Sequence, residues 1–291
     1  ARAGIPRRTM QAPGVQAMSG ASGSSQFLSF VDPTNKYRLC ALNQNGEGAF
    51  PAVEARVSQS DVVVSEAGAM LTMAGDVELG TECAGGCCAG FLRCCLAGES
   101  CYFNRYTVGD NVPSDVALDV VLAPKMPGEV ILVDVVDETR EWRVQQGSYL
   151  GGDEGVQVNV AFNGCCGGCF SGEGCFVLKL QGQGRALLNT YGAAVRYDLS
   201  EGEVRTVDNG ALVAWSSEME YKIGLASKKG GMLSRAVKSF ASGEGIVLRF
   251  TGPGTLYVQT RSFAPLIAAI EPYLPSNKKP AGPADTATIG E

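Results

Sequence analysis

The chain has 291 residues, a formal net charge of −6 and no histidine. Without clustered Lys and Arg it lacks the footprint of a nucleic-acid-binding protein, and without histidine it lacks the commonest general base and zinc ligand. No apolar window reaches the roughly 18 residues that a bilayer-spanning helix needs. The 38 glycines and the aromatic content of 8% favour turns and short strands, so we expect an all-β fold.

Residues 1–54 are predicted to form an N-terminal arm with a first strand. Before Asp32 the sequence contains arginines and several serines but no acidic residue. This composition is typical of the remainder of a transit peptide, and it predicts an organellar protein of the mitochondrion or plastid. A flexible arm without a targeting function is the alternative.

One sequence unit recurs three times, at intervals of roughly 70 residues. Each copy has a glycine between apolar residues and, further on, a Gly-Glu step before an apolar strand; the glycines are Gly68, Gly147 and Gly210, and the glutamates are Glu99, Glu173 and Glu244. Alternating stretches such as VQVNVAF predict half-buried strands. The sequence therefore predicts three tandem β-sandwich units over residues 55–135, 136–203 and 204–262, which stack because each is too small to bury much surface alone.

A Gly-x-Gly step follows the Gly-Glu strand in the two later copies, from Gly182 and from Gly252. Because glycine pairs commonly form tight turns, both steps are predicted to close β-hairpins. Each of the three glutamates is predicted to anchor a turn by accepting backbone N–H bonds. A cation site that gathers all three carboxylates is the alternative.

Ten of the eleven cysteines lie between residues 83 and 175, mostly in Gly-rich connectors. In the third copy the connector GGMLSRAVKSF has the apolar spacing of a short helix. Aligning the first copy with it places Cys87, Cys88 and Cys95 at apolar positions, and Cys101 and Cys175 match Ile246 in a strand. These thiols are predicted to be buried hydrophobes in connector helices and strands.

Five cysteines are not explained by that alignment: Cys83, Cys94, Cys165, Cys166 and Cys169. Cys166 and Cys169 form a C-x-x-C, a spacing that metal knuckles and thiol-redox sites use. The second half of such a frame is missing, so we expect no metal and no cofactor. A zinc or iron–sulfur site, or a thiol-redox function, is the alternative.

Residues 263–291 are predicted to form a C-terminal helix and an extended tail. Ser262 is the expected N-cap, and four apolar residues share one face of the helix: Phe263, Leu266, Ile267 and Ile270. That face either packs back on the chain's own sheet or docks a partner.

The ordered motifs resemble those of one family, related to the fungal altered inheritance of mitochondria protein 24. They include SEAGAMLTMAGDVE, GESCYFNRYT, GEGCFVLKLQGQG, VDNGALVAW and SGEGIVLRFTGPGTLYVQTRS. The resemblance implies a fold similar to the tryptophan RNA-binding attenuation protein, with three units per chain and trimers that assemble into a ring. It also implies no catalytic residues and a link to inner-membrane protein complexes.

We therefore expect a non-catalytic scaffold or assembly subunit, peripheral to an organellar membrane complex. Its expected partners are other protein subunits and, in a homotrimer, copies of itself; nucleic acid is not expected. A metal-binding or thiol-redox protein is the second hypothesis. A ring that binds a small ligand or RNA is the third, and the negative net charge counts against RNA.

Overall fold

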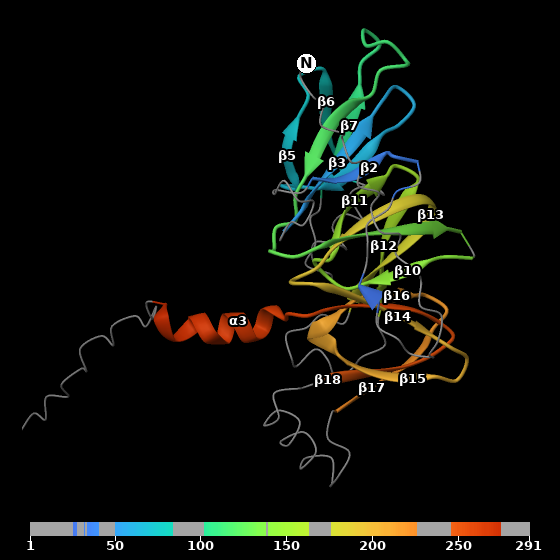
Figure 1. Ribbon diagram of the computed structural model, residues 1–291, viewed down its shortest axis with the longest axis vertical. Coiled ribbons are helices and arrows are strands. Elements are labelled where there is room, and N and C mark those ends of the chain that lie inside the picture. The colour runs from blue at the N-terminus through green and yellow to red at the C-terminus, as the bar shows by residue number, and fades with distance from the viewer. Residues whose placement is uncertain are drawn as a thin grey trace, which may run out of the picture.

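The computed structural model describes residues 26–27, 32, 34–40, 50–83, 102–137, 139–162, 176–225 and 246–274. In this part of the chain nearly all regular structure is β-strand, with one short α-helix near the C-terminal end. The predicted all-β fold is confirmed. Figure 1 shows the strands stacked along the longest axis of the molecule, with the early strands at one end and the last ones at the other.

The first group of strands comprises β3 (Ala52–Val57), β4 (Val63–Glu66), β5 (Met70–Met73), β6 (Val77–Glu82), β7 (Phe103–Val108) and β8 (Leu118–Leu122). β8 pairs with β3 and β5, and β7 pairs with β4 and β6, all antiparallel. In β3 the apolar Val53, Ala55 and Val57 are fully buried, and the charged residues between them are more exposed. The period-two pattern of the sequence thus gives this strand one face in the core.

The second group comprises β9 (Val130–Val136), β10 (Trp142–Val144), β11 (Tyr149–Asp153), β12 (Val156–Phe162) and β13 (Phe176–Asn189). β13 serves two layers. Its first half pairs with β10 and β12, and its second half pairs with β9 and β11.

The third group comprises β14 (Ala194–Leu199), β15 (Val204–Asp208), β16 (Leu212–Ser216), β17 (Glu220–Leu225), β18 (Ile246–Thr251) and β19 (Gly254–Gln259). β19 pairs with β14 and β16, and β18 pairs with β15 and β17. Gly210 lies in η2 (Asn209–Ala211), a short 3-10 turn between β15 and β16.

Both predicted Gly-x-Gly hairpins are wrong. Gly182 and Gly184 lie inside β13, where φ angles of 91° and 145° let the strand pass from one layer to the other without turning back. Gly252 connects β18 to β19, which belong to different sheets and do not pair with each other. In both places the glycines mark a change of layer. The segment after them therefore pairs with other strands and does not fold back on the segment before them.

The three groups are joined by strand pairing as well as by packing. β11 pairs with β4 of the first group, and β16 pairs with β10 of the second. Each group has its own hydrophobic core, and residues of the second group, including Leu150 and Leu187, also enter the core of the first. The stack is therefore held by continuous sheets as well as by apolar contacts.

The N-terminal arm contributes two strands, one to the first group and one to the third. β2 (Tyr37–Cys40) pairs with the edge of β3, and β1 (Gln26–Phe27) pairs with the edge of β14. Between them, residues 32 and 34–36 reach the second group through the contacts described next.

Candidate functional site

The arm segment from Asp32 to Tyr37 lies where the first and second groups meet. The carboxylate of Asp32 accepts hydrogen bonds from the backbone N–H groups of Thr34 and Tyr37, at 2.9 and 2.7 Å. Asn35 has a φ of 58°, a left-handed conformation that asparagine adopts more readily than most residues. This local turn fixes where β2 starts and where Lys36 and Tyr37 are placed.

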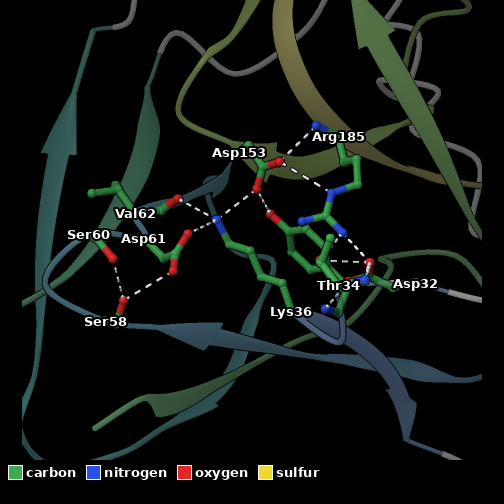
Figure 2. Close-up of polar contacts among 10 residues, drawn as sticks. Asp32, Thr34, Lys36, Ser58, Ser60, Asp61, Val62, Asp153 and Arg185 are labelled. Atoms are coloured by element: carbon green, nitrogen blue, oxygen red, sulfur yellow. Dashed lines mark hydrogen bonds and ion pairs between the residues drawn. The ribbon is translucent and has the colours of Figure 1, made fainter. Parts of the chain in front are cut away.

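Charged side chains from separate parts of the chain meet at this junction (Figure 2). Lys36 Nζ lies 2.7 Å from Asp153 Oδ1 and 3.5 Å from Asp61 Oδ1. Arg185 forms an ion pair with Asp32, and its backbone N–H donates to Asp153 Oδ2 at 2.8 Å. We call Asp32, Lys36, Asp61, Asp153 and Arg185 the junction cluster. It ties the arm to both strand groups.

Tyr37 contacts two members of the junction cluster, Asp153 through its hydroxyl and Arg185 through its ring. The hydroxyl donates to Asp153 Oδ1 at 2.8 Å, and the Arg185 guanidinium lies over the ring, 5.3 Å from its centroid. Such a cation–π contact is attractive and strengthens when the groups are withdrawn from water. Burial and the neighbouring Asp153 carboxylate raise the pKa of Tyr37 far above its ordinary value, so the phenol stays a neutral donor.

Two carboxylates of the junction cluster have lowered pKa values in spite of burial. Burial alone would raise the pKa of Asp153, but hydrogen bonds from Lys36 and Tyr37 and the Lys36 charge outweigh it and hold that pKa below 3.8. The pKa of Asp32 is lowered against burial in the same way, by backbone and side-chain hydrogen bonds from Tyr37 and Thr34 and by the Arg185 charge. Both carboxylates are therefore ionised at neutral pH and paired, an arrangement suited to holding chain segments together.

A cavity of about 280 Å³ lies between the first and second groups, with an apolar floor that includes Val64, Phe103 and Tyr149. Arg105 and Glu154 form an ion pair of 2.5 Å at its lining. The cavity thus combines an apolar interior with charges that already satisfy each other.

A second cavity, of about 300 Å³, lies between the second and third groups. Its lining includes Arg140, which is 3.1 Å from Asp134, and Arg196, which is 2.9 Å from Asp198. Because both cations have carboxylate partners, the cavity shows no clear preference for a ligand of either charge.

The structure describes few of the residues predicted to bind metal. Within the described ranges, no three His, Cys, Asp or Glu side chains come together as a metal site. Cys83, which follows β6, is partly exposed. The remaining candidates lie outside the described residues, and the predictions about them stay predictions: Cys94, Cys165, Cys166, Cys169, the buried-thiol set Cys87, Cys88, Cys95, Cys101 and Cys175, and Glu99, Glu173 and Glu244.

Strand β5, the third strand of the first group, is more exposed than β11 and β16, the third strands of the other two groups. β11 and β16 are almost wholly buried, because each pairs with a strand of the preceding group. β5 is an end strand of its sheet, and Leu71 and Met73 are 61% and 37% exposed. At the far end of the stack β15 is also an end strand, with Val204 43% exposed.

Sequence reasoning missed this pair of edges. The segment MLTM of β5 is as apolar as the buried strands β11 and β16, so composition does not distinguish it from them. The order of strand pairing shows that, among the described residues, β5 has no neighbouring strand on one side.

The predicted C-terminal helix is confirmed as α3 (Phe263–Ile270), followed by the 3-10 turn η3 (Glu271–Tyr273). Ser262 is the N-cap residue but makes no side-chain cap bond, and no residue of the helix is buried. Phe263, Ile267 and Ile270 are 52%, 48% and 44% exposed, and Leu266 is half-buried. Figure 1 shows the helix extending away from the strands, so the alternative in which it packs on its own sheet is wrong.

In the described part of the chain, no helix is both long enough and apolar enough to cross a membrane. In its described part the chain is a β-protein made of stacked antiparallel strand groups, with a paired polar junction and with end strands that include β5 and β15. Comparison with known families places it further: the family model described as mitochondrial biogenesis AIM24 matches residues 43–261, and the chain belongs to that family.

Relatives of the chain occur in bacteria. An uncharacterized protein of Streptococcus pyogenes serotype M6 is 28% identical over 235 residues, covering 78% of this chain and 88% of the relative. The X-ray crystal structure of a Streptococcus pyogenes protein is similar with a TM-score of 0.62 and 27% identity, covering 82% of this chain and all of the other. Family membership therefore does not by itself place a protein in an organelle.

Proposed function

We propose that the protein is a non-catalytic assembly subunit that associates head to tail with further copies of itself, through β5 of one copy and β15 of the next. The observation that carries this proposal is the exposure of β5 where β11 and β16 are buried. An open strand edge with apolar side chains is a template for pairing with another chain.

We infer that the chain contains three copies of one six-stranded unit. The pairing order supports this inference. In the first and third groups the sixth strand pairs with the first and third, and the fifth strand pairs with the second and fourth. In the second group the two halves of β13 take the places of the fifth and sixth strands and pair in the same order. A shared hydrogen bond supports it too: the Arg185 N–H donates to the Asp153 carboxylate, and at the next junction the Thr255 N–H donates to Ser216 Oγ at 2.9 Å. On this order the second unit begins with β9 and the third with β14, earlier than residues 136 and 204.

The same order supplies the rule for association. The third strand of a unit pairs with the second strand of the unit before it, as β11 does with β4 and β16 with β10. Within the chain two strands have no partner under this rule: the third strand of the first unit, β5, and the second strand of the third unit, β15. Pairing β5 of one copy with β15 of another completes the rule between chains.

Equivalent positions also give the register of this contact. Gly151 lies opposite Ser65, and Gly152 lies opposite Val64. If β5 of one copy pairs with β15 of the next in the same register, Thr72 lies opposite Val207 and Met73 lies opposite Thr206. The contact is heterologous, so it either closes into a ring or grows into a filament. The expected trimer is the ring with three copies of the chain.

The arm leaves this contact open. β1 and β2 cover the edges of β14 and β3, whereas β5 and β15 have no neighbour on their outer side among the described residues. An organellar location and a place beside a membrane complex remain part of the proposal, supported by the family description and by the acid-poor start of the sequence.

The proposal is tested by the mass of the purified chain in solution, measured by light scattering. We expect a trimer for the unchanged chain and a monomer for Met73→Lys, because a lysine at an edge opposes pairing. Leu79→Lys is the matched control, since Leu79 is similarly exposed at 43% but lies on β6, outside the proposed contact. A monomeric unchanged chain, or equal masses for both variants, would contradict association through β5.

The thiol hypothesis concerns cysteines outside the described residues and has its own test. The proposed scaffold should carry no stoichiometric zinc or iron when its elements are analysed after gentle purification. About one metal per chain, lost in Cys166→Ser with Cys169→Ser, would favour the metal-binding alternative.

A further inference from the structure

The segment from Phe263 to Leu274 exposes more apolar surface than its length would suggest. Five large side chains are between 44% and 87% exposed: Phe263, Ile267, Ile270, Tyr273 and Leu274. Such a concentration on one short element marks an interaction site, because isolated apolar residues are common on surfaces but contiguous ones are not.

This segment lies beyond the region that the family model matches, which ends at residue 261. It is therefore an addition to the shared strand stack, and its exposed side chains are not needed by the cores of that stack. Because no residue of α3 is buried against the strands, its apolar side chains are available to a partner outside the chain.

The two faces of α3 indicate what that partner is. The large residues of the helix share one face, and the opposite face carries Ala264, Pro265, Ala268 and Ala269, all exposed. A helix that docks in a protein groove normally keeps a polar face for water. Neither face of α3 is polar, so the helix is suited to an environment that is apolar on all its sides.

A second copy of the chain is a poor fit for the same segment. In either of the two cavities described above, the apolar side chains of the helix would lie beside paired charges, Arg105 with Glu154 or Arg140 with Asp134, so neither cavity is a wholly apolar groove.

Charge and length add to the case for lipid. The chain carries a net charge of −6, yet the helix is flanked by Arg261 on one side and by Lys278 and Lys279 on the other, with Glu271 as the acidic residue near its end. Basic residues beside an apolar segment favour anionic headgroups, and tyrosine is enriched at the membrane interface. Eight helical residues rise only about 12 Å, which reaches into one leaflet and cannot span a bilayer.

We propose that residues 263–274 insert into one leaflet of an anionic lipid bilayer and hold the strand stack against the membrane surface. This inference does not depend on association through β5 and β15. It names the surface of the lipid itself, and not a membrane protein, as the partner of the helix.

The test uses the full chain and vesicles of phosphatidylcholine with and without phosphatidylglycerol, separated by sedimentation. We expect the chain to sediment with the anionic vesicles and less with the neutral ones. Ile267→Asp should weaken vesicle binding at least about tenfold, because a charge within the apolar region is strongly disfavoured. Leu79→Asp, a matched charge at an exposed apolar residue of β6, should bind as the unchanged chain does.

A fluorescent reporter makes the insertion itself visible. Both native tryptophans, Trp142 and Trp215, are at most 5% exposed. In Phe263→Trp the added indole should therefore respond to lipid, with its emission moving to shorter wavelength when anionic vesicles are added.

Failure to sediment with either vesicle, equal binding by Ile267→Asp, or an unchanged emission would overturn the proposal. The first of these results is also what a helix that docks into a protein groove would give. Ile267→Asp should keep the mass of the unchanged chain in the absence of vesicles, so loss of lipid binding is distinguished from failure of the proposed assembly.

Discussion

Asp153 shows how much one side chain contributes to this molecule. Its two oxygens accept hydrogen bonds from Tyr37 and from the Arg185 backbone, and it pairs with Lys36. Three segments that are far apart in the sequence thus depend on one carboxylate. Removing one partner of a buried pair costs more than the pair itself contributes, because the remaining charge stays buried.

We predict that Asp153→Asn lowers the free energy of unfolding by about 3 kcal/mol at neutral pH. The lowered pKa of Asp153 sets the pH dependence: its contribution is present above 3.8, the ordinary value, and is lost as the pH falls through the lower folded value. Urea unfolding should show the difference between variant and unchanged chain shrinking in that acidic range.

Asp134→Asn is the control for this measurement, because Asp134 and Arg140 are both more than half exposed. A pair of that kind contributes at most about 1 kcal/mol. If both substitutions had the same small effect at every pH, the junction cluster would not stabilise the fold as described.

Sequence reasoning found none of the residues in the junction cluster. Asp32 and Lys36 lie in a segment whose composition suggests only an arm, and Arg185 lies directly after the Gly-x-Gly step that was predicted to be a hairpin turn. The contacts of Asp32 with Arg185 and of Lys36 with Asp153 join residues more than a hundred positions apart, and no local pattern carries that information. A sequence motif can point only to residues that are close together along the chain, as in a C-x-x-C, and it misses a cluster of this kind.

At the scale of elements, the strands were predictable and their pairing was not. Period-two segments such as VQVNVAF became strands, as β12 shows, because alternation reports one buried face. The Gly-x-Gly steps were misassigned because the same residues serve a hairpin and a change of layer. Positive φ is needed in both cases, and the choice between them is made by the partners of the following strand.

Gly184 is the position where this change of layer can be tested. Its φ is 145°, and a Cβ there would lie 2.8 Å from the Asp153 Cβ and 3.3 Å from a methyl group of Val156. We predict that Gly184→Ala lowers the free energy of unfolding by about 2–3 kcal/mol, from backbone strain and displacement of Asp153. Urea unfolding measures the loss.

Gly224 in β17 provides the matched control, because a Cβ there meets nothing within 4 Å and its φ is not in the left-handed region. Alanine at that position should leave stability unchanged or raise it by up to about 1 kcal/mol. Equal losses at the two glycines would show that Gly184 has no special role in moving β13 between layers.

At the scale of the whole molecule, the N-terminal arm links all three strand groups. β2 covers the edge of β3 in the first group, Lys36 and Asp32 contact Asp153 and Arg185 in the second group, and β1 covers the edge of β14 in the third. The arm thus protects two edges that would otherwise be open to unwanted pairing. It leaves uncovered the two edges that we propose for assembly.

We predict that a chain beginning at residue 43 is less stable by about 3–5 kcal/mol and aggregates, because it loses the partners of Asp153 and Arg185 and uncovers β3 and β14. The double variant Asp32→Asn with Lys36→Met separates these causes, since it removes the charges and keeps β1 and β2. It should lose stability in urea but scatter no more light than the unchanged chain. Aggregation of the double variant to the same extent would mean that the charges, and not the covered edges, keep the stack soluble.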